Sequence, residues 1–464
     1  MPSERTTSRR RKAVLAIRQA FAEFLRLPTL IIAAFLALAV VTYAIDRAGN
    51  DGPLGGARAL LERAMFGDTA STRELLGTIA GALTTITSIT VSLLLVALQQ
   101  SASALTHQVY DQFLRNWHNQ FYFGVLVGLS LFSLVTYAST GPLNAVVGAT
   151  VALALAVAAL FLLLVLFYTT VDQMRPVVII EAIRRHAVQA RFAQHRLLAA
   201  TRSAASPAFG FAIVVPAESH GFVTAVDVLR LREAATQAGG RVEIALLASI
   251  GTHVVYGQPL AEVRASSGEA AQRIAALIEE TVSRGSKRDL AADPLDGIEE
   301  LETIAWTSIS TAQSDPDAGV LAIYGLRDLL ARWQDDADVQ RDDASPVVYI
   351  DDVPERLLNA FESLAVVASE SMQHQSHAEI LRTFDILFER LSERGKARVE
   401  DIVMRTLPAV GDHVLTAELD DAMIRLVATL QRAGREVTAG ALDAARRRLA
   451  ASIGRLGARS TRAA

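Results

Sequence analysis

The stretch GTIAGALTTITSITVSLLLVALQQ, residues 77–100, decides the fold of this chain. It carries no charged side chain, and at about 1.5 Å per residue a helix of this length crosses a hydrocarbon core of roughly 30 Å. We therefore predict a membrane-spanning helix over residues 75–100. It holds more glycine, serine and threonine than a lipid-facing helix needs. At about 100° per residue, one face collects a stripe of small and polar residues: Gly77, Gly81, Thr84, Ser88, Ser92 and Gln99.

The overall composition indicates a membrane part followed by a soluble part. Hydrophobic residues make up 51% of the 464 residues, and their excess lies before residue 175. The chain has no cysteine, which excludes thiolate zinc sites and cysteine nucleophiles. Its net charge of −4 is too small to indicate a nucleic-acid partner. Composition therefore favours an α-helical membrane protein.

Three further apolar runs predict spans over residues 28–46, 121–138 and 143–171, so that residues 28–175 form a domain of four transmembrane helices. Residues 1–27 predict a basic amphipathic helix before them. In the third span, Gly124 and Gly128 stand four residues apart and predict a site of helix packing, which we expect to supply the contact between subunits.

The distribution of arginine predicts the orientation of these spans. Four spans put both termini on one side, and the arginines near the N-terminus and just after residue 171 outweigh those of the loop over residues 47–73. Both termini are expected in the cytoplasm.

The rest of the chain predicts three soluble parts. Residues 176–205 continue the fourth helix as a basic connector, with a kink near Pro176. Residues 206–265 show β-branched alternation and turns, which predicts a small β-rich domain. Residues 266–464 show apolar residues at helical spacing and predict a helical bundle or a short solenoid, with residues 335–355 as an acidic solvated linker.

Several segments together resemble a bacterial family of predicted membrane proteins, domain-of-unknown-function family 2254. They are ARALLERAMF (57–66), the span ending in LVALQQ, the β-rich GFVTAVD (221–227) and GTHVVYGQPLAEV (251–263), and DPLDGIEELETIAWTSIS (293–310). The resemblance covers about residues 28–330 and implies four spans in a bacterial inner membrane. Family members usually carry Pro and Arg after the second span, where this chain has His107 and Gln108. The family brings no established activity.

The β-rich region is also similar to one face of the biotinyl or lipoyl barrel-sandwich fold. The similarity rests on Gly251, Val254, Gly257, Pro259 and Leu260. Cofactor attachment in that fold needs a lysine at a hairpin tip, and this segment contains no lysine. We therefore expect a structural or assembly module without a cofactor.

A search for catalytic motifs finds no nucleophile elbow, Walker loop or dinucleotide-binding glycine pattern. His374 and His377, with Glu379 nearby, have a spacing that metal ligands use. A solvated helix start explains them more simply. We expect no catalytic residue, no metal and no cofactor, and so no enzyme.

The stripe on residues 75–100 has two interpretations. Its small residues serve helix packing alone, or they line a water-filled axis in a symmetric homo-oligomer, where hydroxyl and amide oxygens replace part of the hydration shell of an ion. The second interpretation predicts a channel-like protein for small ions. Cations are slightly favoured by Asp68 and Glu74 at the outer mouth and Asp172 at the inner one. The alternative is a membrane-anchored sensory or interaction scaffold that does not conduct.

Overall fold

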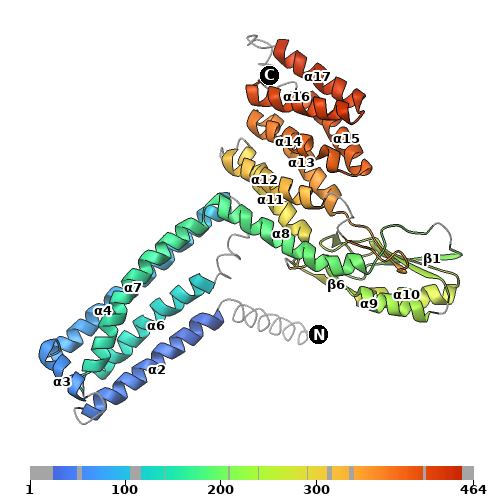
Figure 1. Ribbon diagram of the computed structural model, residues 1–464. Coiled ribbons are helices and arrows are strands. Elements are labelled where there is room, and N and C mark those ends of the chain that lie inside the picture. The colour runs from blue at the N-terminus through green and yellow to red at the C-terminus, as the bar shows by residue number, and fades with distance from the viewer. Residues whose placement is uncertain are drawn as a thin grey trace, which may run out of the picture. The chain divides into compact units, whose positions relative to one another are not determined.

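The computed structural model describes residues 25–49, 55–104, 117–141, 143–206, 209–238, 240–289, 291–310, 316–333, 339–410 and 414–451. The chain divides into two compact units, Met1–Arg175 and Pro176–Ala464. The first unit is helical throughout its described part, and the second combines sheets with helices (Figure 1). Most of the predicted N-terminal helix, and also His107 and Gln108, lie outside the described residues.

The described part of the first unit contains four helices that are long and apolar enough to cross a membrane. They are α2 (Arg26–Ala48), α4 (Thr69–Ala104), α6 (Trp117–Ser139) and α7 (Val146–Gln173). A short helix, α3 (Gly55–Ala64), lies between the first two. The prediction of four candidate spans and a small sheet region in a mostly helical protein is confirmed. The helix α4 is longer at both ends than the predicted span.

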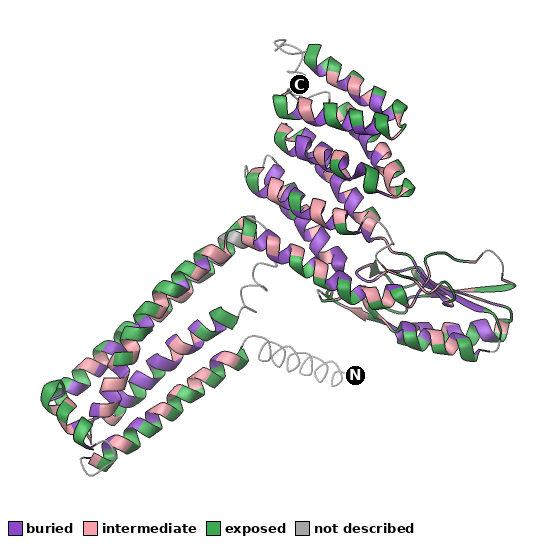
Figure 2. Ribbon diagram, in the orientation of Figure 1, coloured by how far each residue is buried: buried purple, intermediate pink, exposed green. Residues whose placement is uncertain are grey.

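The helix at the centre of this unit is α6, which contacts α2, α4 and α7. Half of its most apolar window is buried, against 17% for each of the other three helices (Figure 2). On α6, Phe132 is fully buried and its ring lies 6.5 Å from the ring of Phe35 on α2. The sequence drew attention to α4, but the helix that holds the unit together is α6.

The second unit begins with α8 (Pro176–Ala199), which the sequence predicted as a connector continuing the fourth span. The sequence also predicted a kink near Pro176, and the helix is interrupted there, at Met174 and Arg175, because proline has no N–H to donate and fits the first turn of a new helix. One face of α8, including Ile179, Ile183 and Ala187, is buried. This face packs on helices of the second unit, so α8 is part of its core.

The β-rich region contains two sheets and two helices. Its elements are β1 (Phe211–Pro216), β2 (Gly221–Val226), α9 (Val228–Gln237), β3 (Val242–Leu246), β4 (His253–Val254), β5 (Pro259–Ala265), α10 (Gly268–Thr281), β6 (Val282–Gly285) and β7 (Val347–Tyr349). The larger sheet has the order β1-β5-β3-β7 and the smaller one β4-β2-β6. Because α10 packs on β1 and β5, and β3 pairs with β7 in parallel, this region is not an all-β barrel-sandwich.

Two strands lie where the sequence predicted none. The strand β6 follows α10 within the region predicted as helix, and β7 lies inside the predicted acidic linker over residues 335–355. All residues of β7 are buried, and Ile244 of β3 pairs with Val347 of β7. The prediction of a solvated linker is wrong at these residues, because an apolar run this short between acidic residues shows no strand periodicity.

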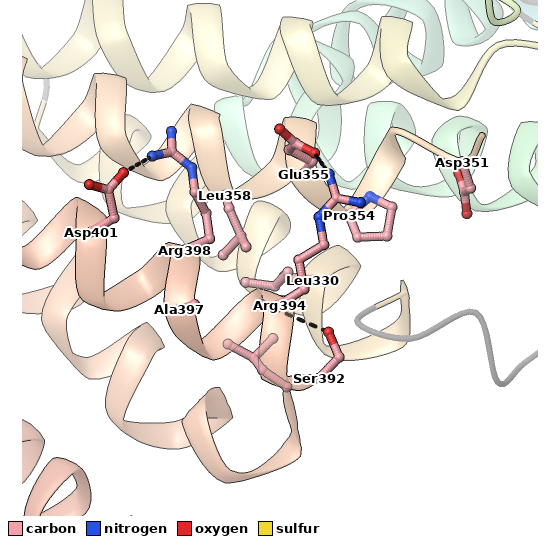
Figure 3. A pocket seen from close by; sticks show the side chains of 12 residues that line it. Leu330, Asp351, Pro354, Glu355, Leu358, Ser392, Arg394, Ala397, Arg398 and Asp401 are labelled. Carbon is pink, nitrogen blue, oxygen red and sulfur yellow. Dashed lines mark hydrogen bonds and ion pairs between the residues drawn. The ribbon is translucent and has the colours of Figure 1, made fainter. Parts of the chain in front are cut away.

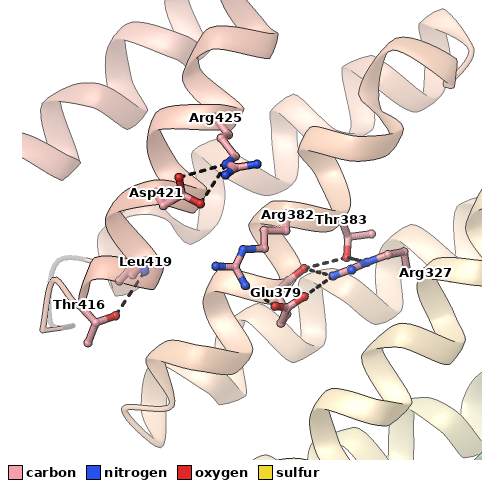
Figure 4. Close-up of polar contacts among 8 residues, drawn as sticks. All are labelled: Arg327, Glu379, Arg382, Thr383, Thr416, Leu419, Asp421 and Arg425. Atoms are coloured by element: carbon pink, nitrogen blue, oxygen red, sulfur yellow. Dashed lines mark hydrogen bonds and ion pairs between the residues drawn. The ribbon is translucent and has the colours of Figure 1, made fainter.

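The remaining helices form a solenoid of two layers. They are α11 (Pro294–Ile309), α12 (Pro316–Trp333), α13 (Val353–Glu370), α14 (His374–Leu387), the 3₁₀ helix η4 (Phe388–Arg390), α15 (Glu393–Val410), α16 (Ala417–Arg432) and α17 (Glu436–Ala451). Every α-helix from α11 to α15 contacts the helix two positions further along the chain. Ion pairs join neighbours within a layer, as where Arg327 of α12 donates to Glu379 of α14 at 2.6 Å (Figure 4).

Candidate functional site

The predicted stripe on α4 lies on the side of the helix that its own chain leaves uncovered. The buried residues Leu76, Ile79 and Leu83 face α6 and α7. The stripe falls nearly opposite to them at about 100° per residue, and its exposed members are Gly81, Thr84, Ser88, Ser92 and Gln99. Only Gly77 is half-buried, and an added Cβ there would lie 3.2 Å from the ring of Tyr137. Packing within the described part of this unit therefore does not use most of the stripe.

Two of the hydroxyl groups on the stripe, those of Thr84 and Ser92, bond to the backbone of their own helix. Thr84 Oγ1 donates to the carbonyl of Ala80 at 2.8 Å, and Ser92 Oγ donates to the carbonyl of Ser88 at 3.0 Å. A hydroxyl that donates its proton in this way still has lone pairs to accept with. Because these donors are satisfied within the helix, the stripe can face lipid. Its oxygens can also accept hydrogen bonds from water or from another helix.

The predicted mouth residues lie at the two ends of the unit. Asp68 accepts a hydrogen bond from the N–H of Ser71 at 2.6 Å, and this bond holds the pKa of its carboxyl below the ordinary value. Glu74 lies nearly two turns further along, on α4, and is exposed. At the other end, Asp172 pairs with Arg175 at 3.3 Å on the surface.

An open groove of about 550 Å³ surrounds Glu74. It is lined by Arg73, Gly77 and Tyr137, among others, and the guanidinium of Arg73 lies 5.0 Å from the centre of the Tyr137 ring. The groove therefore joins the start of the stripe to the end of α6. It carries one cation and one carboxylate, so it favours neither sign of charge strongly.

The two glycines predicted for helix packing lie against α2. A Cβ on Gly124 would lie 2.9 Å from Ile31, and one on Gly128 would lie 2.5 Å from Phe35. Distances this short leave no room for any side chain at either position. Because α2 covers them, these glycines are not exposed for a contact between subunits.

Asp46, Arg58 and the start of α7 form a buried polar cluster that the sequence did not predict. It lies at the same end of the first unit as the start of α4. The carboxylate of Asp46 accepts from the N–H groups of Val147 and Gly148 at 2.9 and 3.0 Å, and so caps the start of α7. Arg58 of α3 lies 3.7 Å from the same carboxylate and donates to the carbonyl of Asn144. The only signal in the sequence was a single acid at the end of an apolar run, with nothing to indicate its distant partners.

The second unit has its own buried charged pair. Arg191 of α8 and Asp351, just after β7, form a two-pronged ion pair with side chains that are 5% and 1% exposed. Arg191 also donates to Gln194, which in turn donates to the hydroxyl of Tyr349. Because a buried charge without its partner is strongly destabilising, this pair constrains how α8 and β7 meet.

The residues with metal-ligand spacing do not converge. His377 is buried beside Ser369, with 3.3 Å between its Nδ1 and the serine hydroxyl. Glu379 is engaged by Arg327 and Arg382 (Figure 4). No group of three or more His, Asp or Glu side chains that could hold a metal ion occurs among the described residues.

The family model of a group described as predicted membrane proteins, DUF2254, matches residues 22–379. The chain belongs to this family. The match covers the four candidate spans, the β-rich region and the first helices of the solenoid. No curated protein and no solved structure matches the chain.

Proposed function

We propose that this family member is a homo-oligomeric, channel-like protein of the bacterial inner membrane, with both termini in the cytoplasm. In this proposal α4 lines a path for small ions, and the second unit assembles or gates the oligomer. The observation that carries it is the uncovered stripe on α4. Small and polar residues lie on the side facing away from α6 and α7, where a helix surrounded by lipid gains nothing from them.

The direction of the hydroxyl bonds supports a preference for cations. Thr84 and Ser92 donate their protons to the backbone, so what these hydroxyl groups still offer to a ligand is the acceptor capacity of their oxygens. Oxygen acceptors replace the hydration shell of a cation, whereas an anion needs donors. Asp68 and Asp172 place carboxylates at the two ends. No charged residue lies on the stripe itself, so we expect no sharp selectivity by valence.

Conduction is tested with the purified protein in planar lipid bilayers. We expect a cation current that falls roughly fivefold or more in Thr84→Leu or Ser88→Leu, because a larger apolar side chain narrows the path and excludes water. The matched control is Thr169→Leu on α7, where the threonine makes the same bond to its own backbone, with 2.9 Å to the carbonyl of Val165. Silent bilayers with a folded oligomer, or a monomer in mild detergent, would contradict the proposal.

The second candidate function is a membrane-anchored sensory or interaction scaffold without conduction. It is favoured by the solenoid of α11–α17, since stacked helices of this kind present extended surfaces for partners. In either case we propose no enzymatic activity. A monodisperse protein that passes no current, but retains a partner protein when α11–α17 is intact, would favour the scaffold.

A further inference from the structure

A cavity of about 470 Å³ lies at one edge of the solenoid (Figure 3). The start of α13 forms one wall and the start of α15 forms another, with Leu330 of α12 also in the lining. Pockets of roughly 300–1,000 Å³ are typical of small-molecule sites. The proposal for α4 and its stripe does not use this cavity.

The lining combines an apolar part with a charged rim. Apolar surface comes from Leu358 of α13, from Leu391 in the turn before α15, and from Ala397 of α15. Two guanidinium groups, those of Arg394 and Arg398, come from successive turns of α15 (Figure 3). An apolar body with a few placed polar groups is the usual composition of a ligand site.

Each carboxylate in the lining already has a cation beside it. Asp351 is paired with the buried Arg191, Glu355 with Arg394, and Asp401 with Arg398. The side chains therefore contribute little net charge. The first turns of α13 and α15 add the positive ends of two helix dipoles, each from a helix of 18 residues. The same first turns carry the acids Glu355 and Glu393, which offset the dipoles, so the cavity is close to neutral while Arg394 and Glu355 are paired.

The pair between Arg394 and Glu355 is the one that a ligand can replace. These side chains are 81% and 50% exposed, and Arg394 reaches across to α13 (Figure 3). Exposed ion pairs contribute little stability, because water screens them. Arg394 contacts Glu355 through one nitrogen only, whereas a ligand carboxylate offers the same guanidinium a two-pronged partner. By contrast, the pair between Arg191 and Asp351 is buried and remains in place.

We propose that this cavity binds a small organic anion, namely a carboxylate carried on an apolar body. Arg394, at the first turn of α15, holds the carboxylate, and Leu358, Leu391 and Ala397 surround the apolar body. Arg398 donates to Glu362, Asp401 and Asn359. It keeps these partners when the ligand binds, so it lines the cavity but does not hold the carboxylate.

The test uses the full-length protein in detergent and three fluorinated probes observed by fluorine NMR. They are para-fluorophenylacetate, its neutral amide, and the cationic para-fluorophenethylamine. We expect the acid to bind about tenfold more tightly than the amide, because a charge-assisted bond is worth about that factor. In Arg394→Ala this preference should disappear. In Ala397→Leu, which fills the apolar part, both the acid and the amide should bind about tenfold more weakly.

The control is Arg425→Ala on α16, which removes an arginine that is 64% exposed and paired with Asp421 within its own helix (Figure 4). It should leave binding of all three probes unchanged. Partitioning of the probes into detergent micelles is the same for every variant, so it does not affect the comparison between variants. Tighter binding of the amine than of the acid, equal effects of Arg394→Ala and Arg425→Ala, or no binding by the unmodified protein would overturn the proposal. None of these outcomes depends on conduction by α4.

Discussion

At the scale of single residues, Asp293 is a strongly perturbed acid that lies outside the spans. Its side chain is fully buried at the start of α11, where it accepts from the N–H of Leu295 at 2.9 Å. Burial raises its pKa to about 7, although Arg288 at 3.5 Å opposes this shift. A Cβ on Gly251, whose φ is +88°, would lie 2.3 Å from the carboxylate, so glycine is required there.

We expect the stability of the second unit to fall as pH rises through about 7 because of Asp293. The folded state binds this proton more tightly than the unfolded chain, whose pKa is near 3.8. The proton on Asp293 therefore makes its full contribution to the free energy of unfolding below pH 3.8, and this contribution is lost as pH rises through about 7. Asp293→Asn keeps the helix cap without the charge. As pH rises from mildly acidic to mildly alkaline, the melting temperature of Asp293→Asn should increase relative to that of the unmodified protein. The change should correspond to about 2 kcal/mol in the free energy of unfolding.

The control for this prediction is Asp227→Asn, the same change at an exposed cap, where the carboxylate accepts from the N–H of Arg230 at 3.0 Å. Thermal unfolding of the three proteins across pH provides the measurement. If the difference between Asp293→Asn and the unmodified protein does not change with pH, or changes equally for Asp227→Asn, burial of Asp293 is not the cause.

At the scale of elements, the contact between α2 and α6 depends on the absence of side chains. We expect Gly128→Val to destabilise the first unit by about 1–3 kcal/mol, because its Cβ would lie 2.5 Å from Phe35 and the helices must separate. Gly81→Val is the matched change on α4, where an added Cβ has nothing within 4 Å in the described part of the chain.

The two glycine variants should affect different measurements. Gly128→Val should lower the melting temperature in detergent, while Gly81→Val should leave it unchanged. If the stripe on α4 faces a second copy, Gly81→Val should instead lower the oligomeric state seen by size-exclusion chromatography with light scattering. Equal melting temperatures for Gly128→Val and the unmodified protein would show that α2 does not pack on α6 in this way.

At the scale of the whole molecule, the absence of cysteine makes the proposed orientation directly testable. We expect Gly67→Cys, in the exposed turn before α4, to react with a membrane-impermeant maleimide on intact bacterial cells. Val437→Cys lies on α17, where Val437 is 80% exposed. It should react only after the cells are permeabilised. Labelling of Val437→Cys in intact cells would reverse the orientation and contradict cytoplasmic termini.

The four apolar helices and the β-rich region can be predicted from the sequence alone, and so can the faces of α4 and α6 that carry small residues. Each of these is a local property. The length of an apolar run decides whether a helix can span a membrane, and the spacing of Gly124 and Gly128 decides that one face of α6 is flat. The stripe on α4 was likewise visible from helical periodicity alone.

The partners of these elements depend on packing between segments that are distant in the sequence. The tertiary structure placed α6 at the centre of the first unit, and it left the α4 stripe uncovered. It also put the short strand β7 beside β3. It joined Asp46 to Val147 and Gly148, which follow it in the sequence by 101 and 102 positions. These contacts bring together residues that are distant in the sequence. A strand of three residues is too short to show a periodic pattern, and a single acidic residue shows none. A pattern within one segment shows which face of it is special, and the packing of the other segments decides what that face meets.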